Sequence, residues 1–324
     1  MELDGQESSN IEDRRGDGGG GGFGGGGFGG GGLGGMGGGM GGGFGGPGIP
    51  IPLGGGLFKG GFGLIAIVVI ALILGINPLS LLGGVVDGGG SYVAPQSQPR
   101  TASRPATNDP ETQFVARVLK STEDVWGGLF QQMGRQYRQP RLVLFRNATQ
   151  TACGPGQSAM GPFYCPSDQR VYIDLTFFDE LAERFRSPGQ FPQAYVIAHE
   201  VGHHVQNLLG ISGKVAQMRE NMSKRDANAM SVRVELQADC FAGVWAYHAS
   251  NDQGGRLKLT DQDIDQAITA ATAIGDDRLQ KQAQGRIVPD SFTHGSSAQR
   301  VRWFKTGLES GDVRRCDTFN AKQL

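Results

Sequence analysis

Three of the chain's five histidines lie within "AHEVGHHVQ", residues 198–206, around a single glutamate. In a helix, His199 and His203 are one turn apart and share a face. Their ring nitrogens can therefore meet one ion at about 2.0–2.1 Å, the distance that zinc prefers. Glu200 is placed to accept a proton from a water molecule at that ion. The segment predicts two zinc ligands and a general base, and its alternative is a polar helix face that binds no metal.

A catalytic zinc site needs a third protein ligand and an open position. Glu235 in "RVELQADCFAGVWA" can supply that ligand. Asp239 follows one turn later and can accept the second N–H of a ligand histidine, which fixes its tautomer. The neighbours of these two acids are mostly apolar, so a bound cation explains the pair better than a solvated acidic face. We predict one Zn²⁺ per chain, with ligands His199, His203 and Glu235 and with Asp239 behind them.

Hydrolysis of a peptide also needs a hydrogen-bond donor for the oxyanion that forms at the carbonyl. His294 in "FTHGSS" is the candidate for this second catalytic role beside Glu200. The alternative for His294 is a histidine that anchors its loop. His204 points away from the ligand face and is expected to pack.

The ligands must be carried by two helices. Ile197, Val201 and Val205 form an apolar stripe opposite the histidines, which predicts a helix over 192–209. A second helix is expected over 227–249. Strands are expected at "RLVLF" (141–145) and "RVYIDL" (170–175), where β-branched and large apolar residues dominate. Strands followed by helices predict an α+β domain, mainly helical with a small sheet, over 108–324.

Residues 1–60 are dominated by glycine, which loses much backbone entropy on ordering and offers no side chain to bury. We expect a disordered cytoplasmic tail there, and a flexible linker over 84–107. Between them, residues 61–83 contain an apolar run of about 21 residues without charge, close to the ~20 that cross a bilayer. A buried core helix and a signal peptide are weaker alternatives, because glycine flanks the run and it begins after residue 60.

Basic residues lie nearer to the amino-terminal side of this run, with Lys59 beside it and Arg100 the nearest on the other side. The positive-inside rule then favours a single-pass protein of the cytoplasmic (inner) membrane, with its amino terminus in the cytoplasm. The folded domain is expected to be periplasmic or extracellular. A net charge of −1 gives no sign of the basic surface that binds nucleic acid.

The four cysteines fit an oxidising location. Cys153 and Cys165 bracket a short turn-rich loop, which would leave Cys240 to pair with Cys316. Four cysteines allow three pairings, and four reduced thiols are a further alternative.

H-E-x-x-H followed by E-x-x-x-D resembles the gluzincin peptidases. The blocks "GPFYCPSDQRVYIDLTFFDEL", "AYVIAHEVGHHVQ", "ELQADCFAGVWA", "IGDD" and "SFTHGSSAQRVRWFKTG" resemble, more closely, the bacterial neutral zinc metallopeptidase family. The resemblance extends from about residue 108 to 319. It implies a zincin-like fold behind one membrane span, and a strand, "RVYIDL", beside the ligand helix whose edge can pair with substrate.

We therefore expect a membrane-anchored zinc endopeptidase of the EC 3.4.24 type. It would hydrolyse peptide or protein substrates with a zinc-bound water and Glu200 as general base. The alternative is an envelope scaffold or binding protein that keeps zinc for stability. Glu200 argues against the scaffold, because a purely structural site needs a fourth ligand and no base. The sequence predicts neither the substrate nor the oligomeric state.

Overall fold

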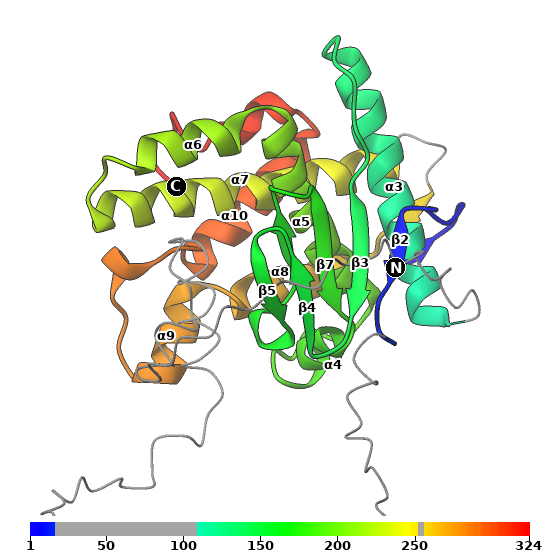
Figure 1. The fold of residues 1–324 in the computed structure, drawn as a ribbon, viewed down its shortest axis with the longest axis horizontal. Coiled ribbons are helices and arrows are strands. Elements are labelled where there is room, and N and C mark those ends of the chain that lie inside the picture. Colours follow the sequence, from blue (N-terminus) through cyan, green and yellow to red (C-terminus); the bar gives the residue numbers. More distant parts are fainter. Residues whose placement is uncertain (17–108, 252–255) are drawn as a thin grey trace, which may run out of the picture.

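The computed structural model describes residues 1–16, 109–251 and 256–324. A small sheet lies against a set of helices, with helix α5 (Gln190–Leu208), which carries His199 and His203, behind the strands in the view of Figure 1. The α+β class predicted from the order of strands and helices is confirmed.

The main sheet has four strands in the order β2 (Ile11–Asp13), β3 (Arg141–Phe145), β7 (Arg170–Asp174) and β6 (Phe163–Cys165). The first three run parallel, and β6 pairs antiparallel with β7. The strand "RVYIDL" thus lies inside the sheet, between β3 and β6. The expectation that its edge is free for substrate is wrong, since β6 occupies that edge.

Two further strand pairs complete the β structure. β4 (Ala148–Thr151) and β5 (Gly154–Gln157) form a hairpin, which a disulfide between Cys153 and Cys165 ties to β6. β1 (Glu2–Leu3) pairs with β8 (Leu257–Lys258). The short helical turns are η1 (Ser158–Met160), η2 (Pro289–Ser291) and η3 (Val313–Cys316).

The long helix α7 (Lys224–Asn251) packs against α5 (Gln190–Leu208), α3 (Pro110–Gln132) and α10 (Ser297–Ser310). The middle of α7 is almost fully buried, from Leu236 to Ala246. A disulfide between Cys240 and Cys316 joins α7 to η3, so both predicted pairings are confirmed. The remaining helices are α4 (Thr176–Glu183), α6 (Ile211–Arg219), α8 (Asp261–Ala273) and α9 (Asp276–Gln284).

Local sequence explains where these helices begin and end. Asp109 caps α3 through its side chain, and Pro110 follows at the first helical position, where no N–H is needed. Thr260 and Asp263 form a reciprocal capping box at the start of α8. Gly210 follows α5 with a φ of 78°, a left-handed conformation that glycine adopts without strain.

The first 16 residues are part of this fold, in contrast to the expected disordered tail. β2 pairs with β3, and Ile11 is buried with 7% of its surface exposed. The Met1 amino group lies 2.7 Å from Asp263. Gly5 and Gly16 are the only glycines among these 16 residues, so the entropy argument for disorder does not apply to them, and backbone pairing and ion pairs stabilise the segment.

The rest of the expected tail (17–60), the expected span (61–83) and the expected linker (84–107) lie outside the described residues. Within 1–16, 109–251 and 256–324, no helix combines the length and the apolar character that a membrane span requires.

Candidate metal centre

Helix α5 has two faces of opposite character. Ile197, Val201 and Val205 are fully buried on one of them, as the apolar stripe predicts. His199 and His203 lie on the other face, with their ring centroids 4.8 Å apart. The helix therefore directs both imidazoles toward the same space.

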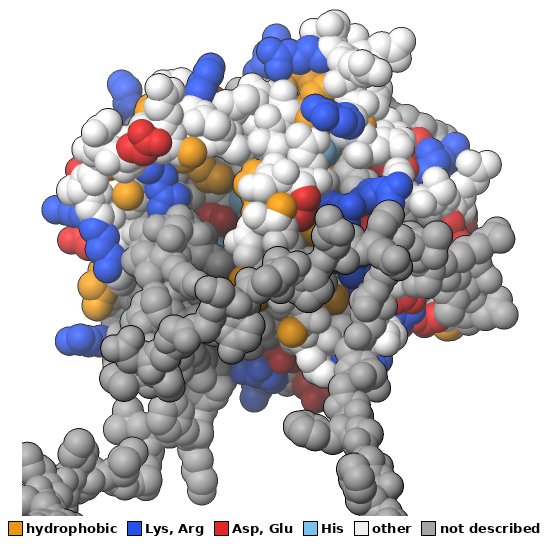
Figure 2. All heavy atoms as spheres, viewed as in Figure 1, with side chains coloured by type: hydrophobic (Ala, Val, Ile, Leu, Met, Phe, Trp, Pro, Cys, Tyr) orange, Lys and Arg blue, Asp and Glu red, His pale blue; other side chains and the backbone are white. Residues whose placement is uncertain are grey.

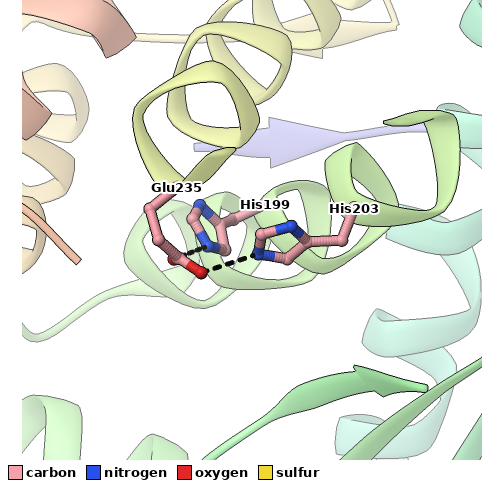
Figure 3. A group of neighbouring side chains, drawn as sticks. All are labelled: His199, His203 and Glu235. Atoms are coloured by element: carbon pink, nitrogen blue, oxygen red, sulfur yellow. Dashed lines mark ion pairs between the residues drawn. The ribbon is translucent and has the colours of Figure 1, made fainter. Parts of the chain in front are cut away.

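The third ligand comes from α7, which crosses α5 at close range. A Cβ atom added at Gly202 would lie 3.0 Å from the carbonyl oxygen of Ala238, so only glycine fits here without displacement. This close approach brings Glu235 of α7 over the two histidines (Figure 3). The chain between α5 and α7, which includes α6, is thus long enough for both helices to contribute ligands to one site.

The ligand atoms converge as predicted. The Glu235 carboxylate lies 3.2 Å from Nε2 of His199 and 3.5 Å from Nε2 of His203 (Figure 3). One ligand atom from each residue falls within 4.8 Å of the others, which suits a single metal ion. Two histidines and a glutamate are the ligand set of many catalytic zinc sites.

Hydrogen bonds on the far side of each ring fix which nitrogen can bind a metal. Nδ1 of His199 lies 2.8 Å from the Asp239 carboxylate, and Nδ1 of His203 lies 2.9 Å from Oε1 of Gln206. The Gln206 amide donates to the carbonyl of Val234, so its oxygen is the atom that faces the ring. Both Nδ1 atoms therefore donate, so each Nε2 faces the Glu235 carboxylate either as the N–H of an imidazolium or as a lone pair that needs a cation. A metal ion between Glu235 and the two rings would accept both lone pairs, so the residues fit a metal.

The pKa shifts agree with this donor set. Burial alone would lower the pKa of His199, but the Asp239 charge and hydrogen bonds to Asp239 and Glu235 raise it to about 10. Burial would raise the pKa of Glu235, but the charge of His203 and hydrogen bonds from both histidines hold it well below its usual value. The cluster thus favours added positive charge, whether protons or a metal ion.

Glu200 lies on α5 beside the ligands, with 7% of its surface exposed, and lines the same cleft. Burial raises the pKa of its carboxyl. A more basic carboxylate at the edge of a metal site is suited to accept a proton. Glu200 thus lies beside the ligand cluster, and its role as general base stays a prediction.

A buried network surrounds Asp239, and its main member, Arg300, was not predicted from the sequence. Arg300 of α10 donates from Nε and Nη2 to the two carboxylate oxygens at 2.9 and 2.8 Å, and Tyr195 donates to Oδ1 at 2.6 Å. Asp239 has no exposed surface. The paired guanidinium keeps this carboxylate charged, since burial alone would raise its pKa but Arg300 and His199 lower it.

His294 reaches the same cleft from the loop before α10. Its Nδ1 lies 3.1 Å from the Asp276 carboxylate, while Asp276 also accepts the backbone N–H groups of Thr293, His294 and Gly295. Burial would lower the pKa of His294, but the charge of Asp276 raises it. Asp276 therefore orients His294, a pairing that was not predicted because 18 residues separate the two.

His204 has the packing role expected of it. It is fully buried, with Nδ1 near the Tyr164 hydroxyl and Nε2 near the carbonyl of Arg138. Burial lowers its pKa to about 4, so the ring stays neutral.

The ligands and Glu200 line a cleft of about 860 Å³. Most of its wall is apolar and comes from the β5–β6 loop, β6, α4, α6 and α9. Figure 2 shows hydrophobic side chains on the viewed face in the area where Figure 1 labels α5, α6 and α7. The apolar wall includes Met160, Phe163, Phe177, Val215, Ile274 and Leu279. A concave and mostly apolar cleft of this size is typical of a ligand-binding site.

Comparison with known proteins agrees with the site. The family model described as "Putative neutral zinc metallopeptidase" matches residues 2–319. The chain belongs to this family.

Two bacterial relatives carry names that state no activity. "Uncharacterized protein YpfJ" of Escherichia coli (strain K12) is 47% identical over 315 residues, which cover 97% of this chain and 96% of the relative. "Uncharacterized protein Rv2575" of Mycobacterium tuberculosis (strain ATCC 25618 / H37Rv) is 42% identical over 267 residues, covering 78% and 86%. No solved structure matches the chain.

Proposed function

We propose that the chain is a zinc-dependent endopeptidase of the gluzincin type. The observation that carries the proposal is the convergence of three ligands beside Glu200 at an open cleft. A zinc ion bound there would supply Lewis acidity and lower the pKa of its water to about 7. The remaining chemistry belongs to the residues around it.

Glu200 accepts the proton of the water that attacks the peptide carbonyl carbon. The C–O bond forms, the C–N bond then breaks, and Glu200 returns the proton to the leaving amine. His294 donates from Nε2 to the oxyanion. Because Nδ1 is committed to Asp276, Nε2 carries a proton only when the ring is an imidazolium, which the carboxylate of Asp276 favours.

An extended substrate can pair with β6, the edge strand that borders the cleft through Phe163 and Tyr164. Its side chains would then meet the apolar wall. We infer that the enzyme prefers large apolar residues next to the cleaved bond.

The rival function is a scaffold stabilised by zinc but without turnover. To separate the two, the purified chain and its Glu200→Gln variant are assayed for zinc content and for cleavage of an unfolded protein. Glu309→Gln, an exposed position on α10, is the matched control. The proposal predicts one zinc in all three proteins and cleavage by wild type and control only. Equal zinc without cleavage by any of them would establish the scaffold.

We also propose that residues 61–83 attach the enzyme to the cytoplasmic membrane. The two disulfides favour its outer face, because thiols stay reduced in the cytoplasm.

A further inference from the structure

The first 16 residues form an integral part of the peptidase domain. Leu142 donates its N–H to the carbonyl of Asn10 at 2.9 Å, and Arg14 donates to Leu144 at 2.7 Å, so β2 continues the sheet. Ser8 donates its N–H to the carbonyl of Ala116 in α3. The segment is thus bound by backbone hydrogen bonds to both a strand and a helix.

A buried carboxylate shows that α3 is built to receive this segment. Glu123 has 4% of its surface exposed and accepts hydrogen bonds from the Ser8 hydroxyl and the Asn10 amide, each at 2.7 Å. A buried carboxylate is costly unless donors surround it. Here the amino-terminal segment supplies two such donors, so its docking satisfies a group inside the domain.

The two borders of the segment 17–108 are held together. Arg15 forms an ion pair with Asp109 at 2.6 Å and donates to the Thr112 hydroxyl at 2.9 Å. Figure 1 shows β2 beside α3 and β3. Residues 16 and 109, which border the segment 17–108, are therefore held at the same place in the fold.

The pairing of β2 with β3 bears on how the chain meets the membrane. One crossing between residues 16 and 109 would put β2 and β3 on opposite faces, where they could not pair. Two helical crossings need about 40 apolar residues, about twice the length of the run in 61–83. We propose that residues 1–16 and 109–324 lie on the same face of the membrane to which residues 61–83 attach the enzyme.

The family match agrees with this assignment, because it begins at residue 2 and so includes the amino-terminal segment. The inference does not depend on zinc or on peptidase activity.

A zero-length crosslink tests the docking in native membranes. Lys258 lies 3.2 Å from Glu2, and both are exposed. A carbodiimide activates the Glu2 carboxyl, and the Lys258 amine displaces the activated group to form an amide. The crosslinked peptide is expected by mass spectrometry in wild type and absent from Glu2→Gln. Its absence from wild-type membranes, or its formation only between isotopically distinct copies, would overturn the docking.

Labelling with a membrane-impermeant maleimide tests the topology. The described cysteines are all in disulfides, so Ser9→Cys and Gln323→Cys each add one exposed thiol. Both variants are labelled in spheroplasts and in inverted vesicles. In a second experiment, the chain with and without residues 61–83 is expressed, and its amount in the membrane fraction is compared. The proposal predicts labelling of both thiols from the same face, and loss of membrane attachment on deletion. Labelling from opposite faces, or attachment unchanged by the deletion, would refute it.

Discussion

At the scale of single residues, the site depends on a buried pair of opposite charges behind the ligands. Arg300 and Asp239 are almost without exposed surface, and Asp239 in turn accepts from His199. If zinc binds with Glu200, Glu235 and Asp239 ionised, then Arg300 and the ion together balance the three negative charges. Arg300 is a positioning residue, because it acts on the metal through Asp239 and His199.

A double-mutant cycle measures the interaction free energy between Arg300 and Asp239. Replacement of Arg300 by Met leaves Asp239 charged and unpaired in the interior, which is expected to cost about 3–5 kcal/mol of unfolding free energy. Asp239→Asn together with Arg300→Met removes both charges, and Asn can still accept from His199. We expect the double variant to be more stable than Arg300→Met alone, measured by urea unfolding of the metal-free protein. Strictly additive losses would contradict the pairing.

Zinc affinity gives a second, independent readout of the same residues. Asp239→Asn weakens the acceptor that orients His199 and is expected to reduce zinc affinity about 10–100-fold. The exposed Asp265→Asn on α8 is the control and should bind zinc like wild type.

The pair of His294 and Asp276 predicts a pH effect. Because Asp276 raises the pKa of His294, the imidazolium persists to higher pH, and the donor at Nε2 is lost only as pH rises through that raised value. Asp276→Asn removes the charge, so the alkaline limb of kcat/KM should move to lower pH while zinc content stays the same. An unmoved limb with unchanged zinc would exclude His294 from the proposed role.

At the scale of elements, the contact between α7 and α10 decides where Arg300 lies. A Cβ atom added at Gly243 would lie 2.2 Å from the carbonyl oxygen of Phe304, so the two backbones meet directly. Gly243→Ala must push the helices apart and is expected to cost about 1–3 kcal/mol of stability. Gly128→Ala in α3, where nothing lies within 4 Å, should instead gain about 0.5–1 kcal/mol. Thermal unfolding of both variants shows whether the loss of stability comes from the close packing at Gly243 or from the replacement of any helical glycine by alanine.

Helices with a strongly periodic apolar pattern could be predicted from the sequence. Contacts between residues or strands that lie far apart in the sequence could not. The ligand helix, predicted over 192–209, runs from Gln190 to Leu208, because its apolar stripe and following glycine are local signals. Arg300 has no such signal, since it meets Asp239 from 61 residues away. β2 has only three residues, two of them acidic, and its partner strand lies more than 100 residues later. The position of β6 at the edge of the sheet could not be predicted either, because it depends on the order of all four strands.

At the scale of the whole molecule, segments far apart in sequence form one sheet. Residues 1–16 contribute β2, the later part of the chain contributes β3, β7 and β6, and Glu123 in α3 lies at the junction. The ion pair of Arg15 and Asp109 holds the two borders of the segment 17–108 together, so a force on either border acts on β2 and on the start of α3. Ile11 packs in the same apolar cluster as α5, α7 and α10, and we predict that the junction nevertheless opens separately from these helices.

Glu123 tests that separation. In Glu123→Leu the Ser8 hydroxyl loses its acceptor, which is expected to cost about 1–3 kcal/mol, whereas Glu123→Gln keeps an acceptor oxygen and should cost less. Because the loss falls on the docked segment, hydrogen-exchange protection of the Ser8 and Arg14 amides should decrease about tenfold or more in the leucine variant. Protection within the buried part of α7 should change little, and zinc affinity should match wild type. Equal loss of protection in β2 and α7 would show that the segment unfolds only with the whole domain, and the two parts would then be one cooperative unit.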